Sequence, residues 1–236
     1  MDKALQHQYL EAMGIQRWVP RDAVMPEPEV IEPAVSAETD VSTTATGEIA
    51  SLDWPELQAM VQQCQQCALH STRTQTVFGV GNQQADWLII GEAPGAEEDK
   101  QGEPFVGSAG LLLTAMLNAL DLQRQQVYIA NMIKCRPPGN RDPHSDEIQQ
   151  CLSYLHRQIA LLQPKLILVV GRIAAQSLLG TSQPLGKLRG RVHTLPETAI
   201  PLIVTYHPAY LLRSPHDKRK AWQDLCLAKQ QLENDS

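Results

Sequence analysis

The sequence lacks any hydrophobic run long enough to cross a membrane and any apolar segment at its start. Apolar content is ordinary for its 236 residues, but no run reaches the roughly 18 residues that a membrane-spanning helix needs. Residues 1–7 do not form the apolar centre of a secretory signal peptide. We therefore expect a cytoplasmic protein. In such a reducing compartment its five cysteines would bind metal rather than form disulfides.

A net positive charge is also missing, because the chain carries a formal charge of −6. The acidity is local: residues 1–56 hold 11 acidic and 3 basic side chains, whereas residues 57–236 hold 15 acidic and 17 basic ones. The larger part of the chain is thus mildly basic. Its C-terminal basic residues could contact phosphate groups or simply form a solvated surface. They are Lys187, Arg189, Arg191, Arg213, Lys218, Arg219 and Lys220.

The N-terminal region divides into an apolar segment and an acidic one. Residues 22–50 contain three prolines, seven acidic residues and no lysine or arginine. Such a composition cannot bury enough apolar surface to offset the entropy lost on ordering. We predict an amphipathic segment at 1–21, a disordered acidic linker at 22–52 and one folded domain at 53–236.

The folded domain shows no internal repeat and alternates β-rich runs with helical patterns. Apolar strands separated by helices predict an α/β fold, in which a parallel sheet is covered on both faces. In such sheets a ligand binds outside the carboxyl ends of the strands. We expect strands near 87–90, 127–131, 166–170 and 202–206, and helices near 108–120, 145–162, 172–179 and 216–232.

Four of the five cysteines form a set suited to binding metal. Cys64 and Cys67 are separated by two residues, a spacing that lets two thiolates bind one metal centre. Cys135 follows the second expected strand and Cys151 lies in the next helix, so the fold could bring them together. Spacing alone does not separate a structural zinc from a [4Fe–4S] cluster. Cys226 stands apart and is expected to be a buried thiol.

Polar and aromatic residues gather after the expected strands. A Gly- and Pro-containing loop at 91–95 and three carboxylates at 97–99 precede Phe105, which could belong to the core or be a platform for a base. His207 could donate a hydrogen bond to a developing anion or be a core histidine. Leu211 and Leu212 could form a wedge that opens a base stack, or pack in the core.

Three segments together resemble the signatures of the family 4 uracil-DNA glycosylases: GEAPGAEEDKQGEPFVGSAGLLL, NMIKCRPPGNRDP and HPAYLLR. The resemblance runs from about residue 57 to the C-terminus. It implies a three-layer α/β/α fold with a four-stranded, mainly parallel sheet, and a bacterial, nucleoid-associated enzyme that acts as a monomer on uracil-containing DNA. The enzyme would hydrolyse the N-glycosidic bond of uracil and leave an abasic site for base excision repair. Cys64, Cys67, Cys135 and Cys151 would hold a structural [4Fe–4S] cluster.

The resemblance also implies roles for individual residues. Phe105 would stack on the extruded uracil, Asn131 would read its pyrimidine edge and Glu98 would exclude thymine at the 5-position. His207 would donate to the uracil oxygen, with Glu92 beside the attacking water. The better-known branch of the superfamily has an aspartate where this chain has Ala93, so either Glu92 activates the water or the backbone alone holds it. DNA would be contacted by Tyr210, Leu211, Leu212 and Arg213.

Two other functions remain open at the level of the sequence. One is a metal-stabilised DNA-binding module without catalysis, and the other is a glycosylase that prefers a different lesion, such as hypoxanthine or thymine opposite guanine. One relative of the family traps uracil-DNA through a histidine in a basic insertion. The corresponding loop here, residues 139–144, lacks that insertion, so we expect turnover.

The segment YLEAMGIQRW at residues 9–18 resembles the opening peptide of the psi subunit of the bacterial replicative clamp loader. This resemblance implies that residues 4–20 dock the enzyme on a replication protein, with Trp18 as the main anchor. A helix that packs back on the enzyme's own domain is the alternative.

Overall fold

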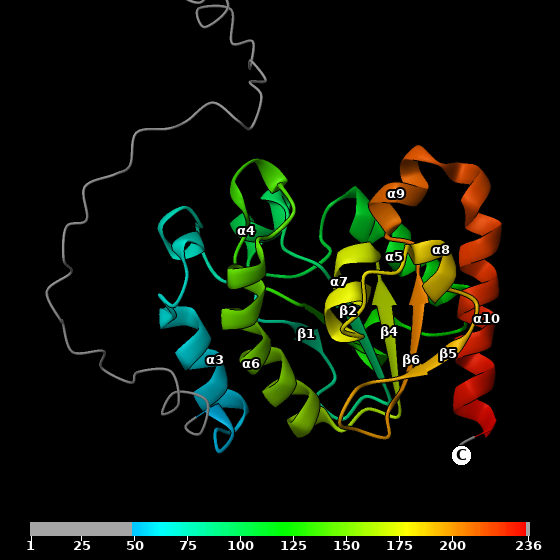
Figure 1. The fold of residues 1–236 in the computed structure, drawn as a ribbon, viewed down its shortest axis with the longest axis horizontal. Coiled ribbons are helices and arrows are strands. Elements are labelled where there is room, and N and C mark those ends of the chain that lie inside the picture. The colour runs from blue at the N-terminus through cyan, green and yellow to red at the C-terminus, as the bar shows by residue number, and fades with distance from the viewer. Residues whose placement is uncertain (1–48, 235–236) are drawn as a thin grey trace, which may run out of the picture. The chain divides into compact units, whose positions relative to one another are not determined.

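The four expected strands form the parallel centre of one sheet. In the computed structural model, which describes residues 49–234, the order of these strands is β3-β2-β4-β6 (Figure 1). Nearly all of their residues are buried, as expected for strands covered on both faces. Their bounds are β2 Trp87–Gly91, β3 Tyr128–Asn131, β4 Leu166–Val170 and β6 Pro201–Thr205.

Two short strands extend the sheet at its edges, so within residues 49–234 it has six strands rather than the expected four. β1 (Val80–Gly81) pairs antiparallel with β3, and β5 (Val192–Thr194) pairs antiparallel with β6. Both are too short and too exposed to show an apolar pattern in the sequence. Short edge strands of this kind limit pairing with other chains.

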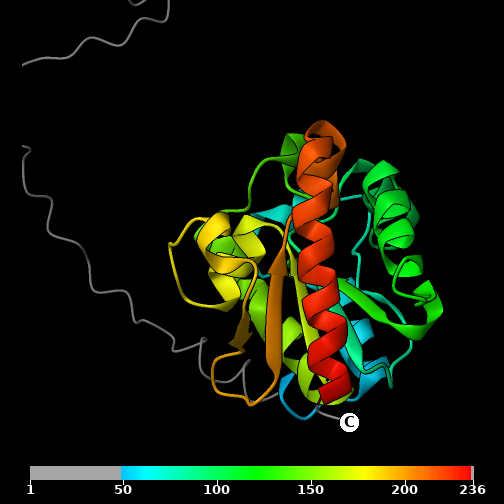
Figure 2. The same cartoon turned by 90° about the vertical axis from the view of Figure 1, so that its right-hand side faces the viewer.

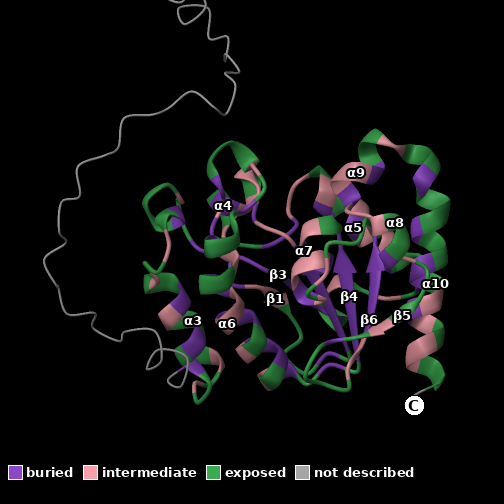
Figure 3. Cartoon of the chain, viewed as in Figure 1, coloured by how far each residue is buried: buried purple, intermediate pink, exposed green. Residues whose placement is uncertain are grey.

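Helices cover both faces of the sheet, which confirms the expected three layers. In β2, Leu88 and Ile90 pack with α6, α7 and α8, while Trp87 and Ile89 pack with α5 and α10. Figure 2 shows α10 lying along the sheet, and Figure 3 shows the strands buried between the helices. The bounds are α5 Ser108–Asn118, α6 Ser145–Leu162, α7 Arg172–Leu178, α8 Leu185–Leu188 and α10 Lys218–Asn234.

A third core lies between α3 (Trp54–Gln63) and α6. A capping box begins α3: Asp53 accepts from the Glu56 N–H, and the Glu56 side chain accepts from the Asp53 N–H. Ile49 is buried in this core and Leu52 packs against it. The packed chain therefore extends at least to Ile49, so the last four residues of the expected linker belong to the folded part.

Residues 1–48 lie outside the described part of the chain. The expected docking peptide at 1–21 and most of the expected linker at 22–52 fall there. None of the helices among residues 49–234 combines the length and the apolar character that crossing a bilayer requires.

Candidate active site

The carboxyl ends of β2, β3 and β6 open on one cavity of about 460 Å³. This position is the one expected for a ligand site in a parallel sheet. Strand β2 leads into Glu92, β3 ends at Asn131, and β6 leads into His207. Seven of the residues expected at the site line this cavity: Glu92, Glu98, Phe105, Asn131, His207, Tyr210 and Arg213.

Phe105 occupies the cavity in a backbone conformation that few non-glycine residues adopt. Its φ is 55°, a left-handed value that costs on the order of 1–3 kcal/mol. A side chain at Gly110 would overlap the Phe105 carbonyl group, and one at Gly91 would overlap the Phe105 ring and the Asn131 amide. The Phe105 ring stacks on His207, with centroids 5.7 Å apart. Two glycines thus leave the space that the aromatic ring and the amide require.

Glu98 fixes the loops on either side of Phe105. It lies in α4 (Ala96–Gln101), where its carboxylate accepts from the Gly95 N–H at 3.1 Å, the Val106 N–H at 3.0 Å and the Gly107 N–H at 3.2 Å. The adjacent Asp99 is buried, and its carboxylate accepts hydrogen bonds from both the backbone N–H and the hydroxyl of Thr74. Glu98 and Asp99 therefore hold backbone in place, whereas Glu97 is exposed and pairs with Lys100.

Asn131 presents an unpaired acceptor to the cavity. The residue is 2% exposed, and its Oδ1 has no hydrogen-bond partner among the described residues. Buried polar atoms are nearly always hydrogen-bonded, because an unpaired one loses its interaction with water without replacement. The arrangement is suited to a ligand that supplies an N–H group.

His207 is oriented as a neutral hydrogen-bond donor. It caps helix α9 (Pro208–Arg213), where its Nδ1 accepts from the Ala209 N–H at 3.2 Å. The proton of the neutral ring is therefore on Nε2. Burial, the largest cause, and the nearby Arg213 together lower the pKa of His207 to about 4, against the opposing effect of Glu98. The ring stays uncharged at neutral pH.

The pKa of Glu92 is raised, whereas that of His207 is lowered. Burial, the largest cause, and the nearby Asp142 together raise the pKa of Glu92 to about 7, against the opposing effect of Arg172. A carboxylate with a pKa near the working pH is suited to accept a proton. The loop after β3 also contributes Asn140 and Arg141 to the cavity. Sequence reasoning missed these two, although both lie within the NMIKCRPPGNRDP segment.

Helix α9 turns its two leucines in different directions. Leu211 is 1% exposed and packs inside the domain, whereas Leu212 is 43% exposed. Leu211 therefore does not present its side chain at the surface of the free protein, and its contact with DNA stays a prediction. Tyr210 and Arg213 face the cavity, and the Tyr210 hydroxyl donates to Asp217 at 2.7 Å.

A buried ion pair supports the chain between β6 and α9. Arg189 donates to both carboxylate oxygens of the fully buried Asp224, at 3.0 and 2.8 Å, and Thr205 donates to the same carboxylate. The Arg189 guanidinium also lies over the Tyr206 ring, which stacks on Tyr210. Arg189 was expected in a basic surface, but it is held by these internal contacts.

The four cysteines of the expected metal site surround one small cavity between α3, the β3–α6 loop and α6. All four are free thiols, and burial raises the pKa of three of them: Cys67, Cys135 and Cys151. Arg73 donates to the Cys135 Sγ at 2.9 Å. In residues 49–234, no three cysteine, histidine or acidic side chains are placed to share a single ion.

The donor set nevertheless fits a multi-iron cluster. Thiols from three segments face a common space, and N–H groups point at two of the sulfurs, which is typical of iron–sulfur sites. Cys226, in contrast, is exposed. The expectation of a buried thiol at that position is wrong.

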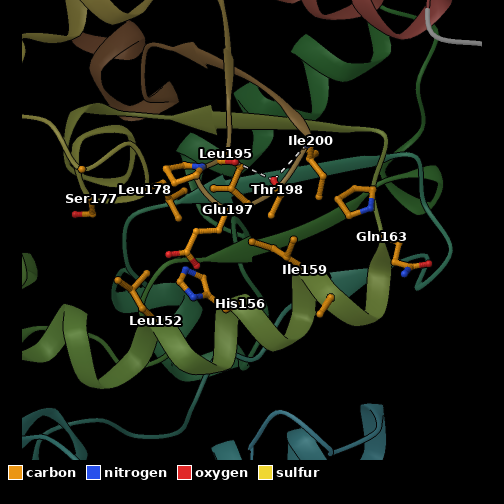
Figure 4. Close-up of a pocket in the computed structure, with 14 residues that line it drawn as sticks. Leu152, His156, Ile159, Gln163, Ser177, Leu178, Leu195, Glu197, Thr198 and Ile200 are labelled. Carbon is orange, nitrogen blue, oxygen red and sulfur yellow. Dashed lines mark hydrogen bonds between the residues drawn. The ribbon is translucent and has the colours of Figure 1, made fainter. Parts of the chain in front are cut away.

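A second cavity, of about 730 Å³, lies between α6, α7 and the β5–β6 loop. Figure 4 shows apolar side chains around it, with His156 and Glu197 facing each other. Burial lowers the pKa of His156, and Glu197 opposes that shift. None of the residues expected to bind substrate or metal lines this cavity.

Comparison with known proteins gives one consistent family. A protein-family sequence model, described as the uracil DNA glycosylase superfamily, matches residues 78–226. A type-4 uracil-DNA glycosylase of Archaeoglobus fulgidus is 43% identical over 161 residues, covering 66% of this chain and 81% of the relative. One of Pyrobaculum aerophilum is 39% identical over 182 residues, covering 75% and 93%. One of Thermotoga maritima is 42% identical over 156 residues, covering 65% and 80%.

Proposed function

The chain belongs to the type-4 uracil-DNA glycosylase family, and on this premise we propose how the cavity at the carboxyl ends of its strands releases uracil. The reaction is hydrolysis of the N-glycosidic bond of uracil in DNA, a step of base excision repair that leaves an abasic site. The observation that carries the site assignment is the unpaired Asn131 Oδ1 in the same cavity as the neutral His207 and the Phe105 ring.

Recognition uses a nucleotide turned out of the base stack, which costs a few kcal/mol. The extruded uracil stacks on Phe105, and its N3–H donates to Asn131 Oδ1. Cytosine has no proton on N3, so it would leave this acceptor buried and unpaired. Sites of this kind reject the wrong ligand strongly. Glu98 walls off the 5-position, and its three backbone hydrogen bonds keep it from moving aside for the methyl group of thymine.

Catalysis depends on charge that develops as the bond between the sugar and uracil N1 breaks. The bonding electrons move onto uracil, and His207 Nε2–H donates to its oxygen. One fixed donor to a developing oxyanion is typically worth about 3–4 kcal/mol. Water attacks the sugar carbon and gives its proton to Glu92, whose pKa of about 7 suits that role. Free uracil takes up a proton as it leaves.

The DNA itself is held by the surface around α9. Leu212 is exposed beside the cavity-lining Tyr210 and Arg213, so we assign it as the wedge that fills the space left by the extruded base. Arg213 neutralises a nearby phosphate.

Cys64, Cys67, Cys135 and Cys151 would hold a [4Fe–4S] cluster. When bound, it supplies no electrons to a hydrolysis and instead ties three segments of the chain together. Protein purified without oxygen is expected to contain about four irons and to absorb near 400 nm. Zinc without iron in the same preparation would refute the cluster while keeping a structural metal.

Residues 4–20 are proposed to dock the enzyme on a replication protein, on the resemblance of residues 9–18 to the psi subunit. Docking would bring a cytoplasmic, nucleoid-associated repair enzyme to newly copied DNA. Co-purification of the full-length chain with clamp-loader components tests this proposal.

The site assignment is tested most simply by Asn131→Asp. A carboxylate keeps an acceptor for the uracil N3–H, but it replaces the amide N–H that would donate to the adjacent uracil carbonyl oxygen and repels that oxygen. Single-turnover release of uracil is therefore expected to fall at least tenfold. The exposed Asn118→Asp is a matched control, since it lies at the end of α5 outside the cavity. Equal uracil release by wild type and Asn131→Asp would remove Asn131 from base recognition.

A further inference from the structure

Lys134 is a fully buried lysine between the cysteine cavity and the uracil site. It is 1% exposed, and it directly precedes Cys135. Its backbone N–H donates to the Cys151 Sγ at 3.2 Å. Its side-chain Nζ donates to the Asn131 carbonyl oxygen at 2.9 Å and to Gln158 Oε1 at 2.6 Å. One residue therefore touches both a metal ligand and the residue that reads the base.

Burial of a lysine needs compensation, because an unpaired ammonium in the interior is very costly. The ammonium is instead stabilised by hydrogen bonds, because its Nζ donates to two acceptors inside the domain, the Asn131 carbonyl and Gln158 Oε1. A buried aliphatic residue would fill the same space without that cost. The lysine thus points to a specific use of its hydrogen bonds.

The acceptors of Lys134 are themselves fixed. Gln158 is fully buried, and its Nε2 donates to the Phe78 carbonyl at 3.0 Å and to the Tyr128 hydroxyl at 3.4 Å. The Asn131 carbonyl marks the end of β3. The Lys134 ammonium therefore connects a rigid point on α6 to the last residue of the strand.

The position of the end of β3 matters for the Asn131 side chain. Among the described residues, no hydrogen bond to its Oδ1 sets the direction of the amide. Its position depends on the backbone, which is paired with Gly91 and followed by a Met132 N–H bond to the Gly91 carbonyl at 2.8 Å. We propose that Lys134 is a positioning residue that clamps the end of β3, holds the Asn131 amide in register for uracil, and couples that amide to the cysteine cluster through Cys151. This inference rests on the proposed function.

The test is Lys134→Met, which keeps an unbranched side chain shorter by one atom and the backbone N–H to Cys151 but removes the ammonium. Cluster-containing protein is compared at equal iron content. Inhibition by free uracil is expected to weaken about tenfold, the effect of losing one well-placed hydrogen bond. Single-turnover cleavage should fall by a similar factor. Affinity for an oligonucleotide with an abasic site should change less than twofold, because that ligand has no base for Asn131.

Lys165→Met is the matched control, since Lys165 is half-exposed and precedes β4 at the end of the sheet opposite the cavity. It should change none of these values. Gln158→Leu is the second variant, because it removes one of the two acceptors of Nζ and leaves the lysine itself. Gln158→Leu should weaken inhibition by uracil severalfold. If Lys134→Met does not fold, this measurement on Gln158→Leu tests the clamp by itself.

Unchanged uracil inhibition in the folded variants would overturn the clamp. Parallel losses of uracil and abasic-site affinity would also overturn it, since they would indicate a general structural defect. If the wild type releases uracil and the variants behave like the wild type, only this inference is refuted. No release by the wild type would refute the proposed function, and this inference with it.

Discussion

Burial shifts the pKa values of two residues of the cavity in the directions that suit catalysis at neutral pH. His207 has a pKa of about 4 and stays uncharged, while Glu92 has a pKa of about 7 and exchanges its proton in the working range. The apolar surroundings disfavour the charged form of each residue. A neutral donor and a weak base therefore face the same substrate without a strong charge between them.

For His207→Ala, we expect single-turnover uracil release to fall by about 10²–10³, the effect of losing one oxyanion donor. DNA affinity should hardly change, because the donor acts on charge that appears in the transition state. The variant also removes the cap of α9, which costs about 1 kcal/mol, so thermal unfolding is measured alongside. Near-wild-type cleavage would contradict the role.

The pH dependence of cleavage follows from Glu92. Only its ionised form accepts a proton from water, so the single-turnover rate should be low below the pKa, rise through about pH 7 and level off above it. His207 adds no inflection in this range, because it is already neutral above pH 5. Glu92→Gln should be slow and lack the rise. If the wild-type cleavage rate is constant from pH 5.5 to 8.5, backbone groups alone hold the attacking water and Glu92 does not activate it.

The motif resemblance predicted most cavity residues but not the direction of each side chain. Leu211 and Leu212 are adjacent in sequence, and only the packing of α9 shows that the first is buried and the second exposed. The carboxylate of Glu98 is likewise fixed by backbone donors that lie up to nine residues away. Neither fact has a signal in a single sequence.

At the scale of elements, α9 depends on the buried pair behind it. Arg189→Met would leave the Asp224 carboxylate buried without its cation, which typically costs about 3–5 kcal/mol. The thermal midpoint should drop by on the order of 10 °C. Lys100→Met breaks the exposed pair with Glu97 and should cost less than about 1 kcal/mol. Similar midpoints for both variants would show that the buried pair contributes no special stability.

The central elements could be predicted because burial on both faces leaves a strong apolar pattern. The four parallel strands and the helices near 108–120, 145–162, 172–179 and 216–232 all lie within a few residues of their expected positions. Helix α4 was missed because its charged residues resemble a loop and its start depends on Glu98. Helix α3 was also missed, although Asp53 and Glu56 carry a capping-box signal that could have predicted it.

On the scale of the whole molecule, the described residues 49–234 contain both the cavity and the four cysteines. Removal of residues 1–40 is therefore expected to leave the thermal midpoint and the cleavage of a short oligonucleotide unchanged, while it abolishes co-purification with clamp-loader components. Removal through residue 52 should lower the midpoint, since Ile49 is buried and the Leu52 carbonyl accepts from Arg157. Retention of partners by the shorter chain would contradict docking.

The central claim is that this cavity removes uracil from DNA, and its most direct measurement is base release by the full-length protein. An oligonucleotide with one uracil is incubated with the enzyme, and free uracil and strand length are measured together. We predict one free uracil for each strand, with the backbone intact until alkali cleaves the abasic site, and no release from matched strands that carry cytosine or thymine. Intact uracil in the DNA after incubation with cluster-containing protein would contradict the account.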